Sequence, residues 1–231
     1  MASDFGRFRG FPASGLRFLE ELAKRNERDF FKPRKERYER ELLEPMRAFV
    51  AEATESLRKA KIPIGGDAKR SIFRIYRDIR FRDDKTPYKT HMAAYLSYDG
   101  GRDTPGGLYV HVAPDRSFFS IAFYNIGKPM LRRWREEMAR HPARFQAVVR
   151  ALARRGHAIL PPEEWDDALS RMPRGFEAHA EDALAQYFRL RSFCVRRVLT
   201  RGDVTSRRML ERAVAFVKDV KPLLDFGWKV D

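Results

Sequence analysis

Residues 73–91 read FRIYRDIRFRDDKTPYKTH, and in this stretch the spacing of hydrophobic residues changes from a helical period to a period of two. Phe73 and Ile75 alternate with charged and polar side chains, which is typical of a half-buried strand. Pro87 restricts the residue before it to an extended conformation. The stretch therefore predicts a strand over residues 73–79 that runs into a shaped loop.

Short apolar segments follow this stretch, and turn residues separate them. They predict further strands over residues 91–98, 108–112, 118–124 and 192–199. Because the connections between the first of these strands are short, neighbouring strands are expected to pair antiparallel. Residues 71–125 are thus predicted to form an antiparallel β-meander within a sheet of about four to six strands.

The flanking segments have helical periodicity instead. Residues 12–58 are predicted to be helical, with Asn26 ending the first helix in a left-handed conformation and Pro45 kinking or breaking the next. Residues 129–226 are predicted to be mainly helical. The order of elements predicts the α+β class: a single domain over residues 1–231, in which N- and C-terminal helices cover a central antiparallel β-meander.

The composition is that of a globular protein. Hydrophobic residues make up 43% of the chain and aromatic residues 13%, which excludes a disordered chain although 34% of residues are charged. The single cysteine, Cys194, excludes a disulfide framework, and its apolar neighbours predict a small buried core residue in a reducing compartment. No segment approaches about 18 consecutive apolar residues, and the N-terminal sequence lacks a signal-peptide pattern. We therefore expect a cytoplasmic protein with no membrane partner.

The formal net charge is +15, which favours association with polyanions and phosphorylated ligands. The positive charge comes mostly from arginines that are spread along the chain, and no tail of like charges is present. Charge alone therefore leaves two classes of partner open, an anionic small molecule and a nucleic acid. It gives no indication of the oligomeric state.

Basic residues are concentrated in the central stretch that predicts the strand and loop. In a regular strand, Arg74, Tyr76, Asp78 and Arg80 share one face, and Arg77 lies on the other. The planar guanidinium fork suits phosphate or carboxylate groups, and a loop after a strand commonly carries function. We therefore predict a site for a phosphate- or carboxylate-bearing ligand, lined by Arg74, Arg77, Arg80, Lys85, Tyr88 and Lys89.

The sequence does not decide whether the protein is an enzyme. If it is, Asp78 or His91 is the predicted proton carrier, since both lie within the basic stretch. No glycine-rich nucleotide motif and no histidine pairing with zinc-ligand spacing is present, so we expect no cofactor and no metal.

Three alternative functions stay open. The first is nucleic-acid binding through the same basic surface and the arginine-rich segments 132–155 and 196–212. The second is a structural or adaptor domain in which the arginines and aspartates form an ion-pair network. The third is a metal-dependent nuclease, because Asp83 and Lys85 have the spacing of an acid-x-Lys motif and could be joined by Asp67 or Asp78.

One long string in the central stretch, R-x-x-R-D-x-R-F followed by D-K-x-x-Y, runs from Arg74 to Tyr88. It resembles the signature of a bacterial and fungal family known only as domain of unknown function 2461, and the resemblance covers nearly the whole chain. Asp29-Phe30 and Phe123-Tyr124-Asn125 depart from it, since relatives tend to carry an aromatic pair at the first and a tryptophan at the second. The resemblance implies a relationship across the whole fold and no particular mechanism. Supporting segments are Gly10-Phe11-Pro12, residues 26–31, 173–176 and 220–226.

Overall fold

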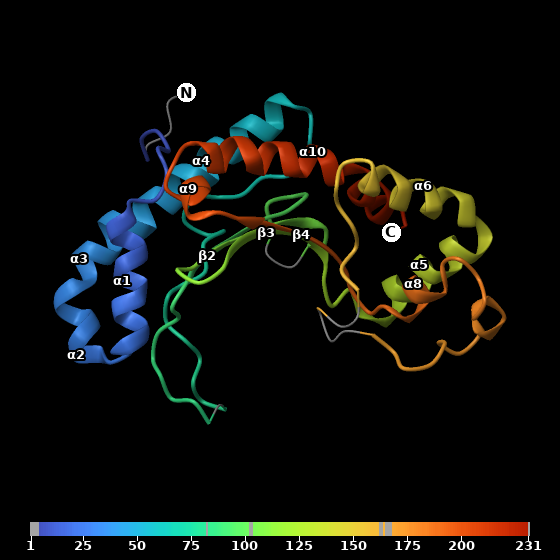
Figure 1. Cartoon of the computed structure of the whole chain (residues 1–231), viewed down its shortest axis with the longest axis horizontal. Helices are drawn as coiled ribbons and strands as arrows, with labels where there is room; N and C mark the ends of the chain where they lie inside the picture. Colours follow the sequence, from blue (N-terminus) through green and yellow to red (C-terminus); the bar gives the residue numbers. More distant parts are fainter. Residues whose placement is uncertain (1–4, 82, 102–103, 162–163, 165–167, 231) are drawn as a thin grey trace. The chain divides into compact units, whose positions relative to one another are not determined.

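The computed structural model describes residues 5–81, 83–101, 104–161, 164 and 168–230 (Figure 1). The chain divides into two units, each with its own internal packing. The first unit comprises Met1–Thr104, Leu108–Phe119 and Val198–Ala215, and the second comprises Pro105–Gly107, Ser120–Arg197 and Phe216–Asp231. The single domain expected for residues 1–231 stays a prediction.

Helices dominate the N-terminal part of the first unit. Helix α1 (Ala13–Lys24) buries leucines that recur at helical spacing, as the sequence predicts. Pro45 has no N–H to donate to the preceding turn, and the irregularity predicted there is a π-helical turn directly before it. The segment after α1 is a succession of α2 (Arg28–Phe31), the 3-10 turn η1 (Lys32–Arg34), α3 (Lys35–Tyr38), the π-turn η2 (Glu39–Leu43) and α4 (Glu44–Lys59).

The strands form one four-stranded antiparallel sheet in the order β1-β2-β3-β4, which confirms the predicted α+β class. In β1, Met92 lies opposite Val112 of β2, and Leu96 lies opposite Leu108. Alternate residues on these strands are fully buried, and α4 packs on β1. The strands are β1 (Met92–Leu96), β2 (Gly107–Val112), β3 (Ser117–Phe123) and β4 (Phe193–Leu199).

The second unit is built around Trp134, which is fully buried. Its ring stacks on Phe193 with a centroid distance of 4.1 Å and packs against Phe123 at 5.0 Å. Cys194 lies in the same unit, so the prediction of a buried core cysteine is confirmed, and burial raises the pKa of its thiol to about 11. Further helices of the described residues are α5 (Gly127–Arg140), α6 (Pro142–Ala153), η3 (Glu177–His179), α8 (Ala185–Arg189), α9 (Arg201–Val204) and α10 (Arg208–Lys229).

Candidate functional site

The basic stretch folds into a hairpin that extends from the sheet (Figure 1). The regular strand predicted over residues 73–79 is wrong, because pairing there is confined to isolated bridges. Pro87 contributes to this irregularity, since it has no N–H to donate to a ladder. The bridges join Ile72 to Ala94 and Tyr76 to Tyr88, and backbone hydrogen bonds of 2.8–2.9 Å run from Phe73 N to Ala93 O, Arg77 N to Pro87 O and Lys89 N to Ile75 O.

The Arg77 side chain forms its ion pair within the hairpin, with partners that the other arginines do not share. Its side chain is half-buried and donates to the Asp84 carboxylate and the Thr86 hydroxyl across the hairpin. The hydrogen bonds from Thr86 and the Arg77 guanidinium lower the pKa of Asp84 to about 2. This pair is therefore the kind of ion pair that the structural alternative predicts.

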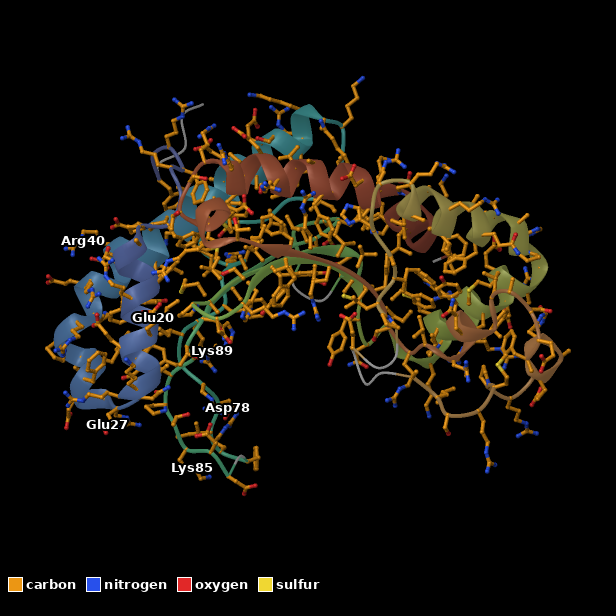
Figure 2. The ribbon with its side chains drawn as sticks, in the orientation of Figure 1. Glu20, Glu27, Arg40, Asp78, Lys85 and Lys89 are labelled. Carbon is orange, nitrogen blue, oxygen red and sulfur yellow. The ribbon has the colours of Figure 1, made fainter. Side chains whose placement is uncertain are left out.

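The far end of the hairpin holds a second ion pair. Arg80 Nη2 lies 2.8 Å from Asp78 Oδ2, and the Lys85 ammonium donates to the Ile79 carbonyl at 3.1 Å. Figure 2 shows Asp78 and Lys85 toward this end and Lys89 where the hairpin meets the sheet. The contacts of Arg80 and Lys85 are therefore with residues 78 and 79 of the same hairpin. These side chains lie apart from Lys89.

Asn26 fastens the hairpin to the helical segment. Its side-chain amide donates to the Tyr88 carbonyl at 2.9 Å and accepts from the Tyr88 N–H at 3.0 Å. The predicted left-handed helix end at Asn26 is wrong, because the residue does not have a positive φ. Instead, Asn26 satisfies both backbone groups of a buried residue 62 positions away. The ring of Phe31 then stacks on Tyr88 with a centroid distance of 4.3 Å.

Two hollows lie between this helical segment and the hairpin, with volumes of about 410 Å³ and about 620 Å³. Both are lined by Phe31, Lys35 and Tyr76, so we treat them as one site and call it the basic groove. Tyr76 is 49% exposed, and its ring centroid lies 5.5 Å from that of Tyr88. The basic groove therefore has aromatic rings in both of its hollows.

The lining of the basic groove is strongly positive. Among its described lining residues Glu39 is the only acid, and its carboxylate lies 3.5 Å from the Lys35 ammonium. Such a surplus of positive charge in a recess attracts anions. Within the described part of the chain, Arg28, Lys32 and Arg74 have no carboxylate within salt-bridge distance, as the ion pairs of the structure involve other side chains. The cations of the lining are Arg28, Lys32, Lys35, Lys69, Arg74, Arg77 and Lys89.

The basic groove contains four of the six side chains that the sequence predicts to bind a ligand: Arg74, Arg77, Tyr88 and Lys89. Arg80 and Lys85 are not among its lining residues, since they lie toward the far end of the hairpin. The helical side of the groove was not predicted from the sequence. The sequence pattern that could have indicated this side is the spacing i, i+4, i+7, which places three cations on one face of a helix. These cations are Arg28, Lys32 and Lys35.

The two predicted proton carriers are outside the lining of the basic groove. Asp78 is exposed, and the hydrogen bonds from Arg80 lower its pKa to about 2, which makes it a weak base near neutral pH. His91 lies beside His111 of β2, with 4.3 Å between ring centroids. Burial, and then the nearby Lys89 ammonium, lower the pKa of His91.

The nuclease alternative has little support in the positions of its acids. Asp67 Oδ1 accepts from the backbone N–H groups of Lys69 and Arg70 at 2.8 and 2.7 Å, and Asp78 is paired with Arg80. Over the residues that the structure describes, no group of three or more His, Cys, Asp or Glu side chains is placed to hold a metal ion. Asp67 and Asp78, the two acids that the nuclease alternative would join to Asp83, are therefore each engaged with other groups of the protein.

The lowered pKa of His91 predicts that stability decreases on the acid side. The unfolded chain binds a proton at a histidine near its usual pKa of about 6.5, whereas the folded chain holds the ring neutral to lower pH. The contribution is therefore present above that pH and is lost as the pH falls. We expect His91→Gln to reduce the loss of melting temperature between about pH 7 and about pH 5 by roughly 2 °C. The exposed His141→Gln is the control, and equal curves for wild type and His91→Gln would contradict the expectation.

The structure is that of an α+β protein with a basic groove between a helical segment and an irregular hairpin. The model of the family described as conserved hypothetical protein (DUF2461) matches residues 14–226, and the chain belongs to this family. No curated protein and no solved structure matches the chain. In the described ranges, no helix combines the length and the apolar character that crossing a membrane requires.

Proposed function

We propose that this protein binds a phosphate-bearing anion in the basic groove. The observation that carries the proposal is the lining of the two hollows, in which seven lysines and arginines face a single acid, Glu39. Charged groups in a recess interact more strongly than those on a flat surface, because the recess holds less screening water. An anion in the groove would neutralise the charges of Arg28, Lys32 and Arg74, for which the described residues provide no carboxylate within salt-bridge distance.

The choice of phosphate over carboxylate rests on the number and position of the cations. The Arg28, Lys32 and Arg74 side chains come from two different segments, and a group with several acceptor oxygens and more than one negative charge can reach more than one of them. Phe31 and Tyr76 add flat apolar surface beside these charges. A ligand with both a phosphate and a planar ring would use both features of the groove.

The structural alternative is supported only where the Asp78–Arg80 and Arg77–Asp84 pairs engage two arginines of the hairpin. It does not apply to Arg28, Lys32 and Arg74. The arginine-rich segments named in the nucleic-acid alternative also contain many paired side chains, such as Arg132 with Glu136. The basic groove is therefore the better candidate for any anionic partner.

The proposal is tested by isothermal titration calorimetry with inorganic pyrophosphate. We expect Arg74→Gln and Lys32→Gln each to weaken binding about tenfold or more, the loss typical of one charge-assisted hydrogen bond. Arg132→Gln on α5 is the matched control, because that arginine is exposed and already paired with Glu136. Absence of binding heat in the wild type, or an equal loss in the control, would overturn the proposal.

A further inference from the structure

An exposed aromatic side chain lies toward the far end of the hairpin, beyond the part that lines the basic groove. Phe81 is 93% exposed, the highest value among the large hydrophobic side chains of the described residues. The Arg80 guanidinium lies over its ring, 5.8 Å from the centroid. Leaving a phenylalanine in water forgoes the free energy that burial would provide, so a bound partner would gain by covering it.

Tyr76 is the second exposed ring of the hairpin, and it lines both hollows of the basic groove. Exposed rings interleaved with cations are the arrangement by which proteins hold single-stranded nucleic acid, since bases stack on the rings and phosphates meet the cations. We propose that the hairpin and the basic groove together bind single-stranded nucleic acid, with bases stacking on Tyr76 and Phe81. This inference rests on the proposed function, because the phosphates would occupy the same groove.

The length of the hairpin sets the size of this site. Tyr76 and Phe81 are five residues apart in the sequence, so their backbones are separated by at most about 18 Å. At a spacing of about 3.4 Å per nucleotide, this distance accommodates at most roughly five stacked nucleotides. The site therefore fits a short single-stranded segment and requires no long track across the molecule.

The recessed cations favour a nucleic acid over an anionic membrane. Arg74 and Lys32 line hollows between the helical segment and the hairpin, whereas Phe81 is nearly fully exposed. A flat bilayer that receives Phe81 cannot also enter these hollows, while a flexible phosphodiester chain can. A duplex is disfavoured for a different reason, since its bases are stacked on one another and cannot stack on Tyr76.

Two of the three acids of the hairpin are paired with its own arginines. Asp78 and Asp84 would repel phosphates, but each is held by an arginine of the same hairpin, Arg80 and Arg77. The Arg80 guanidinium stays beside the Phe81 ring while it pairs with Asp78. A base stacked on Phe81 would therefore meet a ring with a fixed cation next to it.

The experiment is fluorescence anisotropy with a labelled oligothymidylate of about 12 nucleotides, within the range of single-strand sites. We expect binding that weakens as salt rises from about 50 to about 200 mM. Phe81→Ala should weaken it about 5- to 150-fold, the range for loss of one base–aromatic stack, and Phe81→Trp should restore it. Tyr124→Ala is the control, because Tyr124 is also exposed, at 63%, and lies in the second unit.

Titration of the same variants with pyrophosphate separates this inference from the proposed function. Because Phe81 is not among the residues that line the groove, Phe81→Ala should bind pyrophosphate like the wild type. Pyrophosphate binding without oligonucleotide binding would overturn the inference and leave the proposed function in place. Equal affinity for a duplex of the same length, or Phe81-dependent binding to phosphatidylserine vesicles in its place, would also overturn it. If the wild type binds neither pyrophosphate nor the oligonucleotide, both proposals are overturned.

Discussion

Replacing Gly10 with alanine is expected to lower the free energy of unfolding by about 4 kcal/mol, at the high end for a single substitution. Gly10 has a φ of +107°, which residues with a side chain rarely adopt. A Cβ at this position would also lie well inside van der Waals distance of the backbone of Thr205 and Ser206. The loss is measured by urea denaturation followed by circular dichroism.

The reason for this sensitivity is the close packing of the N-terminal segment on residues 204–207. Phe11 N donates to Val204 O at 2.9 Å, and Arg207 Nη1 donates to Phe8 O at 2.9 Å. An alanine at position 10 must push these backbones apart, so it weakens the hydrogen bonds on both sides of it.

Gly156→Ala is the matched control for this prediction. Gly156 also has a positive φ, +73°, but a Cβ there would meet nothing within 4 Å. It therefore isolates the conformational strain, which costs about 1 kcal/mol. If Gly10→Ala loses no more stability than Gly156→Ala, the close approach at Gly10 has no energetic weight.

Much of the fold could be predicted from the sequence because it depends on local periodicity. Strands β1 to β4 lie where short apolar segments between turn residues predict them, and α1 follows its leucine spacing. The strand over residues 73–79 fails for a physical reason that periodicity does not contain. A half-buried alternating pattern fits a hairpin arm as well as a sheet strand, and only the number of backbone partners distinguishes the two.

The candidate site was predictable only on its hairpin side. Arg74, Arg77 and Lys89 stand out in the sequence because they lie in one dense basic stretch. Arg28 and Lys32 do not, because a helix is recognised by its apolar face and its charged face is usually solvated. Which helix faces the hairpin depends on contacts between residues far apart in the chain, and no local pattern encodes them.

The Asn26 amide joins the helical segment to the hairpin through its hydrogen bonds to Tyr88. Asn26→Ala is expected to lower the free energy of unfolding by about 3 kcal/mol. The substitution leaves both the N–H and the C=O of buried Tyr88 without their partner, and each unsatisfied group costs roughly 1–3 kcal/mol. Asn26 is not among the lining residues of the basic groove, but it joins the helical wall to the hairpin wall. Pyrophosphate affinity should therefore fall as well, by about tenfold, because the cations from the two walls lose their fixed spacing.

Asn26→Asp tests whether stability depends on both hydrogen bonds between the Asn26 side chain and the Tyr88 backbone. An aspartate keeps the acceptor for the Tyr88 N–H but has no donor for the Tyr88 carbonyl, so its stability should lie between those of the wild type and Asn26→Ala in urea denaturation. Arg74→Gln provides the opposite case, since it should weaken binding and leave stability within about 0.5 kcal/mol of the wild type. If Asn26→Ala is as stable as the wild type, the hairpin is held by the Phe31–Tyr88 ring stack instead. If Asn26→Ala loses stability and keeps its affinity, the cations of the hairpin bind phosphate without the helical wall.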